Sequence, residues 1–197
     1  MAYSDFTLPV LKKQFGLTIA DTGDLTSAAA PVPPPPGLAE TLARYLPLAF
    51  RINTEKAKSE LVVAPVLAEF KFQHDDQVSL FSGIDFVVDK EAGLTGRCDF
   101  ILARGRSQLF LESPLCVVVE AKNDDIGAGL PQCLAGMVAA QRFNDRDGLT
   151  GPVHGIVTTG LLWRFLRLDG SAAVIDPAEL AVHDLPKLFG ILSAIAL

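Results

Sequence analysis

The segment Leu115-Cys-Val-Val-Val-Glu-Ala121 is apolar on both faces of an extended chain. Side chains alternate between the two faces of a strand, so a strand of this composition has to be covered on both sides. The segment therefore predicts a central strand in a sheet that carries helices on both faces. Glu120 is the polar exception within it, and a carboxylate in such surroundings is costly unless it is paired or binds a metal.

The segments around this strand alternate between strand-like and helix-like patterns, which predicts an α/β sandwich. A turn at 90–93 joins two strand-like runs, and Asp169-Gly170 is a second hairpin signal. We expect a mixed central sheet of about five strands flanked by helices. The expected strands cover 80–89, 94–103, 115–121, 153–159, 162–168 and 172–175, and the later helices cover 126–143 and 177–197.

Prolines organise the first third of the chain. Four consecutive prolines within 27–37 exclude a helix or a central strand there. We therefore divide the chain into an amino-terminal arm with a Pro-rich connector (1–37) and a single domain (38–197). We expect the arm to dock on another surface, with a second subunit as one candidate. A short helix over 38–46 should stop at Pro47, and a helix over 54–70, capped by Asn53, should bend near Pro65.

Composition excludes several classes of protein. The 197 residues carry a net charge of −6, which excludes a generally basic nucleic-acid coat and a polybasic membrane binder. No apolar run reaches the ~18 residues of a membrane helix, and the amino terminus does not resemble a secretory signal. Three cysteines without CxxC spacing indicate reduced thiols. We expect a cytoplasmic protein without membrane contact.

Three polar side chains within the apolar strands are candidates for chemistry. Asp99 lies in the strand-like run Gly96-Arg-Cys-Asp-Phe-Ile-Leu102, and a hairpin-like return would place it beside Glu120. Glu120 and Lys122 are two residues apart, so both leave the same face of the sheet. Two carboxylates suit Mg²⁺ or Mn²⁺. A neighbouring lysine can orient or deprotonate water and offset the charge of a phosphate.

This arrangement of Asp99 and Glu120-Ala-Lys122 resembles the PD-(D/E)XK nuclease superfamily, which has the restriction-endonuclease-like fold. The resemblance extends over residues 54–168 and includes the order of the elements. It implies that Asp99 and Glu120 bind the metal, and that Glu60 on the preceding helix joins them. It also implies that Lys122 assists the attacking water and that Gln132 on the following helix contacts the site.

The sequence departs from that family at two positions. Cys98 stands where a proline often precedes the aspartate, and Gly136 stands where the branch with a Gln-x-x-x-Tyr motif has tyrosine. The second departure weakens the assignment of Gln132.

Each candidate residue also has a structural explanation. Glu120 and Lys122 can form an ion pair at the end of a strand, and Asp99 can cap a turn. Glu60 can pair with Lys56 on a solvated helix face. Gln132 can serve packing alone.

The residues therefore predict a magnesium-dependent endonuclease that hydrolyses DNA phosphodiester bonds. Arginines within the nuclease-like span predict a local track for phosphates despite the acidic total. The alternative is a catalytically silent nuclease-like module with a binding or structural role in a multi-protein system. A third possibility is a small-molecule pocket protein. The apolar carboxy terminus, 188–197, predicts a buried helix and favours a homodimer.

Overall fold

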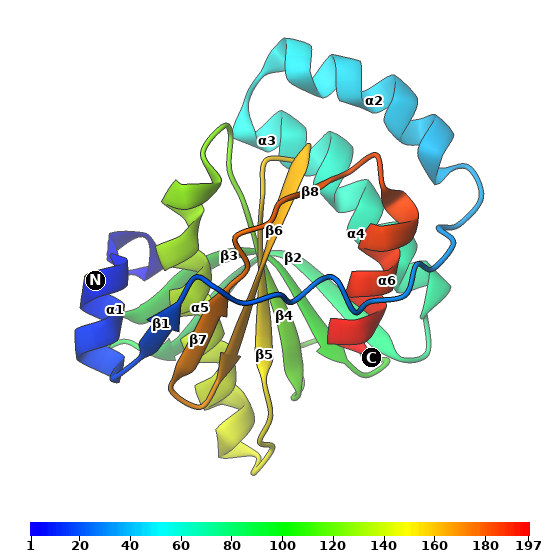
Figure 1. Cartoon of the computed structure of the whole chain (residues 1–197). Coiled ribbons are helices and arrows are strands. Elements are labelled where there is room, and N and C mark those ends of the chain that lie inside the picture. The colour runs from blue at the N-terminus through cyan, green and yellow to red at the C-terminus, as the bar shows by residue number, and fades with distance from the viewer.

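The computed structural model describes residues 1–197 and has an α/β architecture built on one mixed sheet (Figure 1). The strand order is β1-β7-β6-β5-β4-β3-β2, and β8 pairs with β6. The strands are β1 (Thr18–Ala20), β2 (Val78–Asp89), β3 (Leu94–Arg104), β4 (Leu115–Ala121), β5 (Val153–Thr158), β6 (Leu162–Asp169), β7 (Ala172–Ile175) and β8 (Leu180–Ala181).

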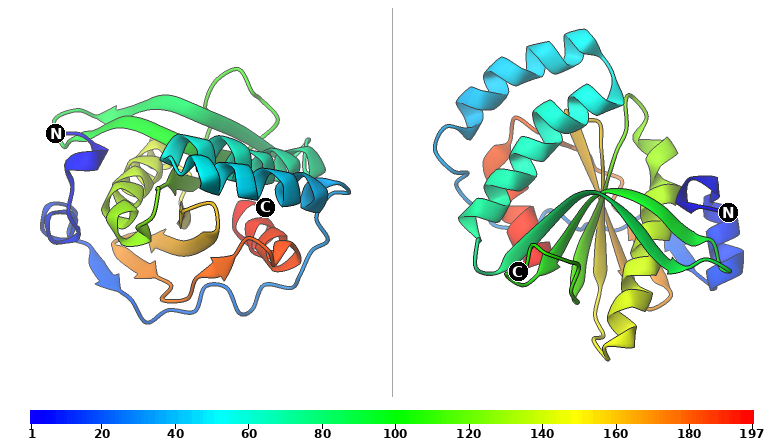
Figure 2. Two further views of the ribbon diagram at one scale, coloured as in Figure 1. Left: turned by 90° about the horizontal axis from the view of Figure 1, so that it is seen from above. Right: turned by 180° about the vertical axis from the view of Figure 1, so that it is seen from behind.

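Helices cover both faces of this sheet, as Figure 2 shows. One face packs against α5, and the other packs against α2, α4 and α6. The helical elements are η1 (Tyr3–Asp5), α1 (Leu8–Phe15), α2 (Leu38–Ile52), α3 (Glu55–Lys58), the π-helical turn η2 (Ser59–Val63), α4 (Ala64–Gln73), α5 (Ile126–Arg146) and α6 (Leu185–Ala196).

The predicted central position of Leu115–Ala121 is confirmed. Every residue of β4 is buried, and the strand lies between antiparallel β3 and parallel β5. The expected count of about five strands is wrong, because the sheet has eight. The additional strands β1 and β8 have three and two residues, too few to leave a periodic pattern in the sequence.

The prolines act differently from the prediction at one of two positions. Helix α2 continues through Pro47 to Ile52, so the expected stop at 46 is wrong. Pro47 and Ala43, whose carbonyl loses its helical partner, are both exposed, and water can take the place of the missing bond. The irregularity expected near Pro65 is present as the π-helical turn η2 directly before it.

The amino-terminal arm packs against its own chain. Tyr3 and Leu11 are buried in the core beside α5, and β1 pairs in parallel with β7. The connector crosses α6 closely, since a Cβ built on Gly190 would lie 2.0 Å from the carbonyl oxygen of Ala30. Residues 1–37 thus pack against residues 38–197 of their own chain.

The carboxy-terminal helix is shorter than expected. It covers Leu185–Ala196 and is largely buried, as its apolar composition predicts. All three cysteines are free and buried. None of the helices combines the length and apolar character that crossing a bilayer requires.

Candidate functional site

The candidate residues meet where β3 and β4 stop pairing. The ladder between these strands runs from Ala103 to Phe100, which lies opposite Val119. One residue further along, the Ala121 backbone N–H donates to Oδ2 of Asp99 at 2.8 Å. A side-chain carboxylate therefore accepts a backbone hydrogen bond at this end of the strand pair, which fixes Asp99 beside the end of β4.

Glu120 and Lys122 leave β4 on the side of α5, as their spacing predicts. The Nζ of Lys122 donates to Oε1 of Glu120 at 2.7 Å and to Oε1 of Gln132 at 3.2 Å. Gln132 comes from α5, so the helix that follows the strand orients the lysine. The structure thus brings Glu120, Lys122 and Gln132 into one hydrogen-bonded group.

The negative charge of Asp99 lies near this group and shifts the pKa of Glu120. Burial and the nearby charge of Asp99 raise the pKa of Glu120 to about 7, although Lys122 opposes the shift. The Glu120 side chain is only 4% exposed, with Lys122 as its one hydrogen-bond partner. Burial alone would lower the pKa of Lys122, but its hydrogen bond to Glu120 and the charges of Glu120, Glu55 and Asp99 together outweigh burial and raise it. Lys122 is therefore held in its protonated form.

Glu55 is a carboxylate near the site that the resemblance did not assign. It lies in the first turn of α3 and adds to the rise in the pKa of both Glu120 and Lys122. Its side chain lines the same cleft as Asp99.

Glu60 lies in the π-helical turn and is placed differently. Its side chain is 61% exposed and pairs with Lys56 at 2.8 Å. It lines the cleft, but the chain contains no group of three or more His, Cys, Asp or Glu side chains arranged to hold a metal ion. The structure therefore leaves Asp99 and Glu120 without Glu60 as a third member.

A polar cleft of about 410 Å³ opens between α3–η2, the middle of β2 and β3, and the end of β4. Asp99 and Ala121 form part of its floor, whereas Glu120 and Lys122 lie on the α5 side and are not exposed in it. Ionic groups dominate the wall. They are Glu55, Lys56, Glu60, Arg97 and Asp99.

Lys58 anchors the helix that forms one wall of this cleft. The side chain is 2% exposed and donates to the Asn123 carbonyl oxygen at 2.6 Å and to Oδ1 of Asp124 at 2.9 Å. It also lies 4.9 Å from the centre of the Phe50 ring. A buried ammonium thus joins α3 to the segment directly after Lys122, a role that sequence patterns did not indicate.

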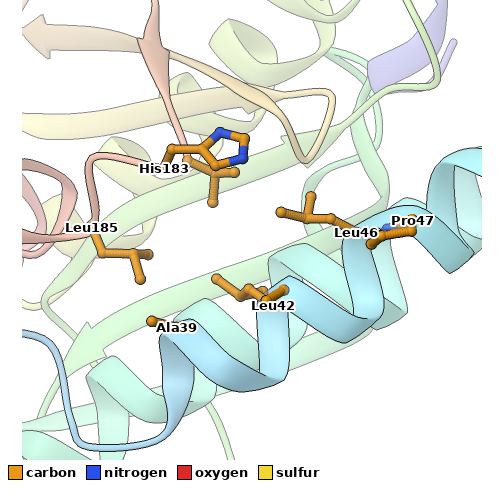
Figure 3. A pocket seen from close by; sticks show the side chains of 8 residues that line it. Ala39, Leu42, Leu46, Pro47, His183 and Leu185 are labelled. Atoms are coloured by element: carbon orange, nitrogen blue, oxygen red, sulfur yellow. The ribbon is translucent and has the colours of Figure 1, made fainter.

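A second pocket is lined mainly by apolar side chains, unlike the polar cleft. Figure 3 shows Leu42 and Leu46 of α2 facing His183 and Leu185 across a space of about 270 Å³. His183 is the only polar side chain in its lining, and no carboxylate reaches it. This pocket offers no side-chain oxygen ligand for a hard cation.

Comparison of the chain with protein-family models and with curated proteins gives no match.

Proposed function

We propose that this chain is a Mg²⁺- or Mn²⁺-dependent nuclease that hydrolyses DNA phosphodiester bonds on a restriction-endonuclease-like fold. The observation that carries the proposal is that Asp99, where β3 and β4 stop pairing, lies close enough to the buried Glu120 to raise its pKa, while protonated Lys122 donates to Glu120. Structural carboxylates are normally satisfied by donors rather than placed together.

Each of the two carboxylates keeps an oxygen of the kind that a hard divalent cation prefers. Asp99 keeps one carboxylate oxygen beyond the one that accepts from Ala121, and Glu120 has one oxygen beyond that bonded to Lys122. Two carboxylates whose charges repel each other gain stability when a cation lies between them. A bound divalent cation would supply positive charge to the scissile phosphate and lower the pKa of water.

The remaining steps belong to side chains of this chain. Water attacks phosphorus and releases its proton to solvent, while the bond from phosphorus to the leaving oxygen breaks and that oxygen takes a proton from solvent. Lys122, held protonated, stabilises the negative charge that develops on the phosphate oxygens. Gln132 holds the lysine in place through its 3.2 Å hydrogen bond and is a positioning residue. Protonated Lys122 is not a base at this stage, so its role is charge stabilisation and orientation.

The direct experiment combines calorimetric titration of Mn²⁺ with cleavage of plasmid DNA. We expect wild type to bind the metal and cleave, and Asp99→Asn to lose both. Lys122→Met should keep metal binding and lose cleavage by about 10²-fold or more. Glu60→Gln serves as the matched carboxylate control and should retain binding. Equal metal binding by wild type and Asp99→Asn would refute the proposal.

A catalytically silent module on the same fold is the second candidate. The observation that favours it is the ion pair of Glu60 with Lys56, which leaves only two carboxylates at the centre. Metal binding without cleavage of single-stranded, double-stranded or supercoiled DNA would support this candidate over the nuclease.

A further inference from the structure

Arg97 extends into the polar cleft although a carboxylate lies opposite it on the neighbouring strand. The register of β2 and β3 pairs Asp85 directly with Arg97. Arg97 nevertheless forms none of the ion pairs of the chain. Its guanidinium lies over Gly83, where a Cβ would approach Nη2 to 2.9 Å. The side chain lines the cleft, and Asp85 does not.

Gly83 makes this position possible. It has a left-handed φ of 62° and lies between Ser82 and Ile84, which pair with Phe100 and Cys98. Gly83 is therefore the residue across from Asp99. The missing side chain leaves space for a guanidinium next to the strand position that carries Asp99.

The charge of the cleft gives this guanidinium a function. Three carboxylates line it, and Lys56 on the opposite wall is already paired with Glu60. A nucleic-acid strand entering such a cleft is repelled unless positive charge meets its phosphates. Arg97 is the cation of the cleft that has no protein partner, and a guanidinium offers two parallel donors that match a phosphate group.

We propose that Arg97 binds a backbone phosphate of the nucleic-acid substrate in the cleft that Asp99 lines. This inference rests on the proposed nuclease function and adds the group that holds the strand in the cleft. A phosphate contact positions the strand and carries no base information. Arg97 therefore contributes affinity that is independent of the DNA sequence.

The test measures binding of a short fluorescein-labelled DNA strand by anisotropy, in EDTA so that no cleavage occurs, over a series of salt concentrations. Arg97→Gln should weaken binding about tenfold and reduce the slope of log K against log salt by about 1. Arg97→Lys should recover the slope and part of the affinity, because it restores the charge without the paired donors. Arg51→Gln is the matched control, since Arg51 is an exposed arginine of α2 outside the cleft.

The outcomes separate this inference from the proposed function. Loss of affinity in Arg97→Gln but not in Arg51→Gln supports the phosphate contact. Equal losses in both variants, or none in either, overturn it, and the nuclease proposal stands if wild type still binds Mn²⁺ through Asp99 and cleaves plasmid. A wild-type protein that neither binds the strand nor cleaves overturns both.

Discussion

Two buried carboxylates of this chain have opposite surroundings. Asp176, which follows β7, is 2% exposed and accepts hydrogen bonds from the backbone N–H groups of Leu25 at 2.8 Å and Ala178 at 2.9 Å. Glu120 is buried to nearly the same degree, yet it accepts from Lys122 alone and lies near the like charge of Asp99. Burial itself therefore does not mark a functional carboxylate. The supply of donors distinguishes the two.

The two carboxylates should have opposite effects on the stability of the fold. Asp176 ties the amino-terminal segment to the end of β7, so its charge is used to hold the fold together. Glu120 resists burial as an anion, which costs stability that a bound cation would restore. Substitutions at the two positions should accordingly have opposite signs.

The largest effect is expected for Asp176→Ala. Two backbone N–H groups lose their acceptor, and each such loss costs about 1–3 kcal/mol. We expect the free energy of unfolding to fall by about 2–5 kcal/mol, together with faster proteolysis within 1–37. Urea denaturation measures the first and limited trypsin digestion the second. The control is Asp169→Ala, at an exposed ion pair, which should change stability by less than ~0.5 kcal/mol. Similar losses in both variants would contradict the structural role of Asp176.

His154 provides the next test, because its pKa is shifted mainly by burial and it has no role in the candidate site. Burial, together with the charges of Arg167 and Arg104, lowers the pKa of His154 to about 4. The folded pKa lies below the unfolded value of about 6.5. The unfolded chain therefore binds the proton first, and stability falls as pH drops from about 6.5 to 4.

We expect the free energy of unfolding to fall by about 2–3 kcal/mol between roughly pH 7.5 and pH 4.5. Urea denaturation at the two pH values measures this difference. His154→Gln should remove most of the difference between the two conditions. An unchanged pH dependence in the variant would show that other groups dominate acid destabilisation.

A smaller effect of opposite sign is expected for Glu120→Gln in EDTA. The variant removes a buried negative charge from beside Asp99 and keeps an oxygen that can accept from Lys122. We expect a gain of about 1 kcal/mol in the free energy of unfolding at pH 8. The gain should shrink toward pH 5, where protonation neutralises Glu120 in the folded wild type. A clear destabilisation at pH 8 would place Glu120 with Asp176 as a structural carboxylate.

The smallest effect is expected for Glu60→Gln. The ion pair with Lys56 is exposed on both sides, and such helical pairs contribute about 0.3–0.5 kcal/mol. Thermal denaturation should shift little, and Mn²⁺ affinity should stay within about twofold of wild type. A tenfold loss of Mn²⁺ affinity would return Glu60 to the metal centre, as the family resemblance implied.

Sequence reasoning recovered the elements whose patterns are long and regular. The central strand β4, the β2–β3 hairpin and helix α5 follow from apolar periodicity and turn signals, and the structure has them within a few residues of the expected bounds. The proximity of Asp99, Glu120, Lys122 and Gln132 agrees with strand pairing and with two-residue alternation.

What sequence reasoning missed depends on contacts between distant segments. The arm joins the sheet through three residues of β1 and through Asp176, neither of which a local pattern reveals. Lys58 finds its partners 65 and 66 residues away. Glu60 was assigned through the family resemblance, which says nothing of which acid on this helix lines the cleft, so Glu55 was not considered for the site.

The π-helical turn at Ser59–Val63 also means that the number of residues in this part of the helix, and not only their identity, decides which acid faces the cleft. Such a turn corresponds to one extra residue within an α-helix. Deleting one residue there would restore the regular helix and rotate α3 by about 100° relative to α4. Insertions and deletions at this point would redirect Glu55, Lys56 and Lys58 together, leaving Asp99 and Glu120 in place on the sheet.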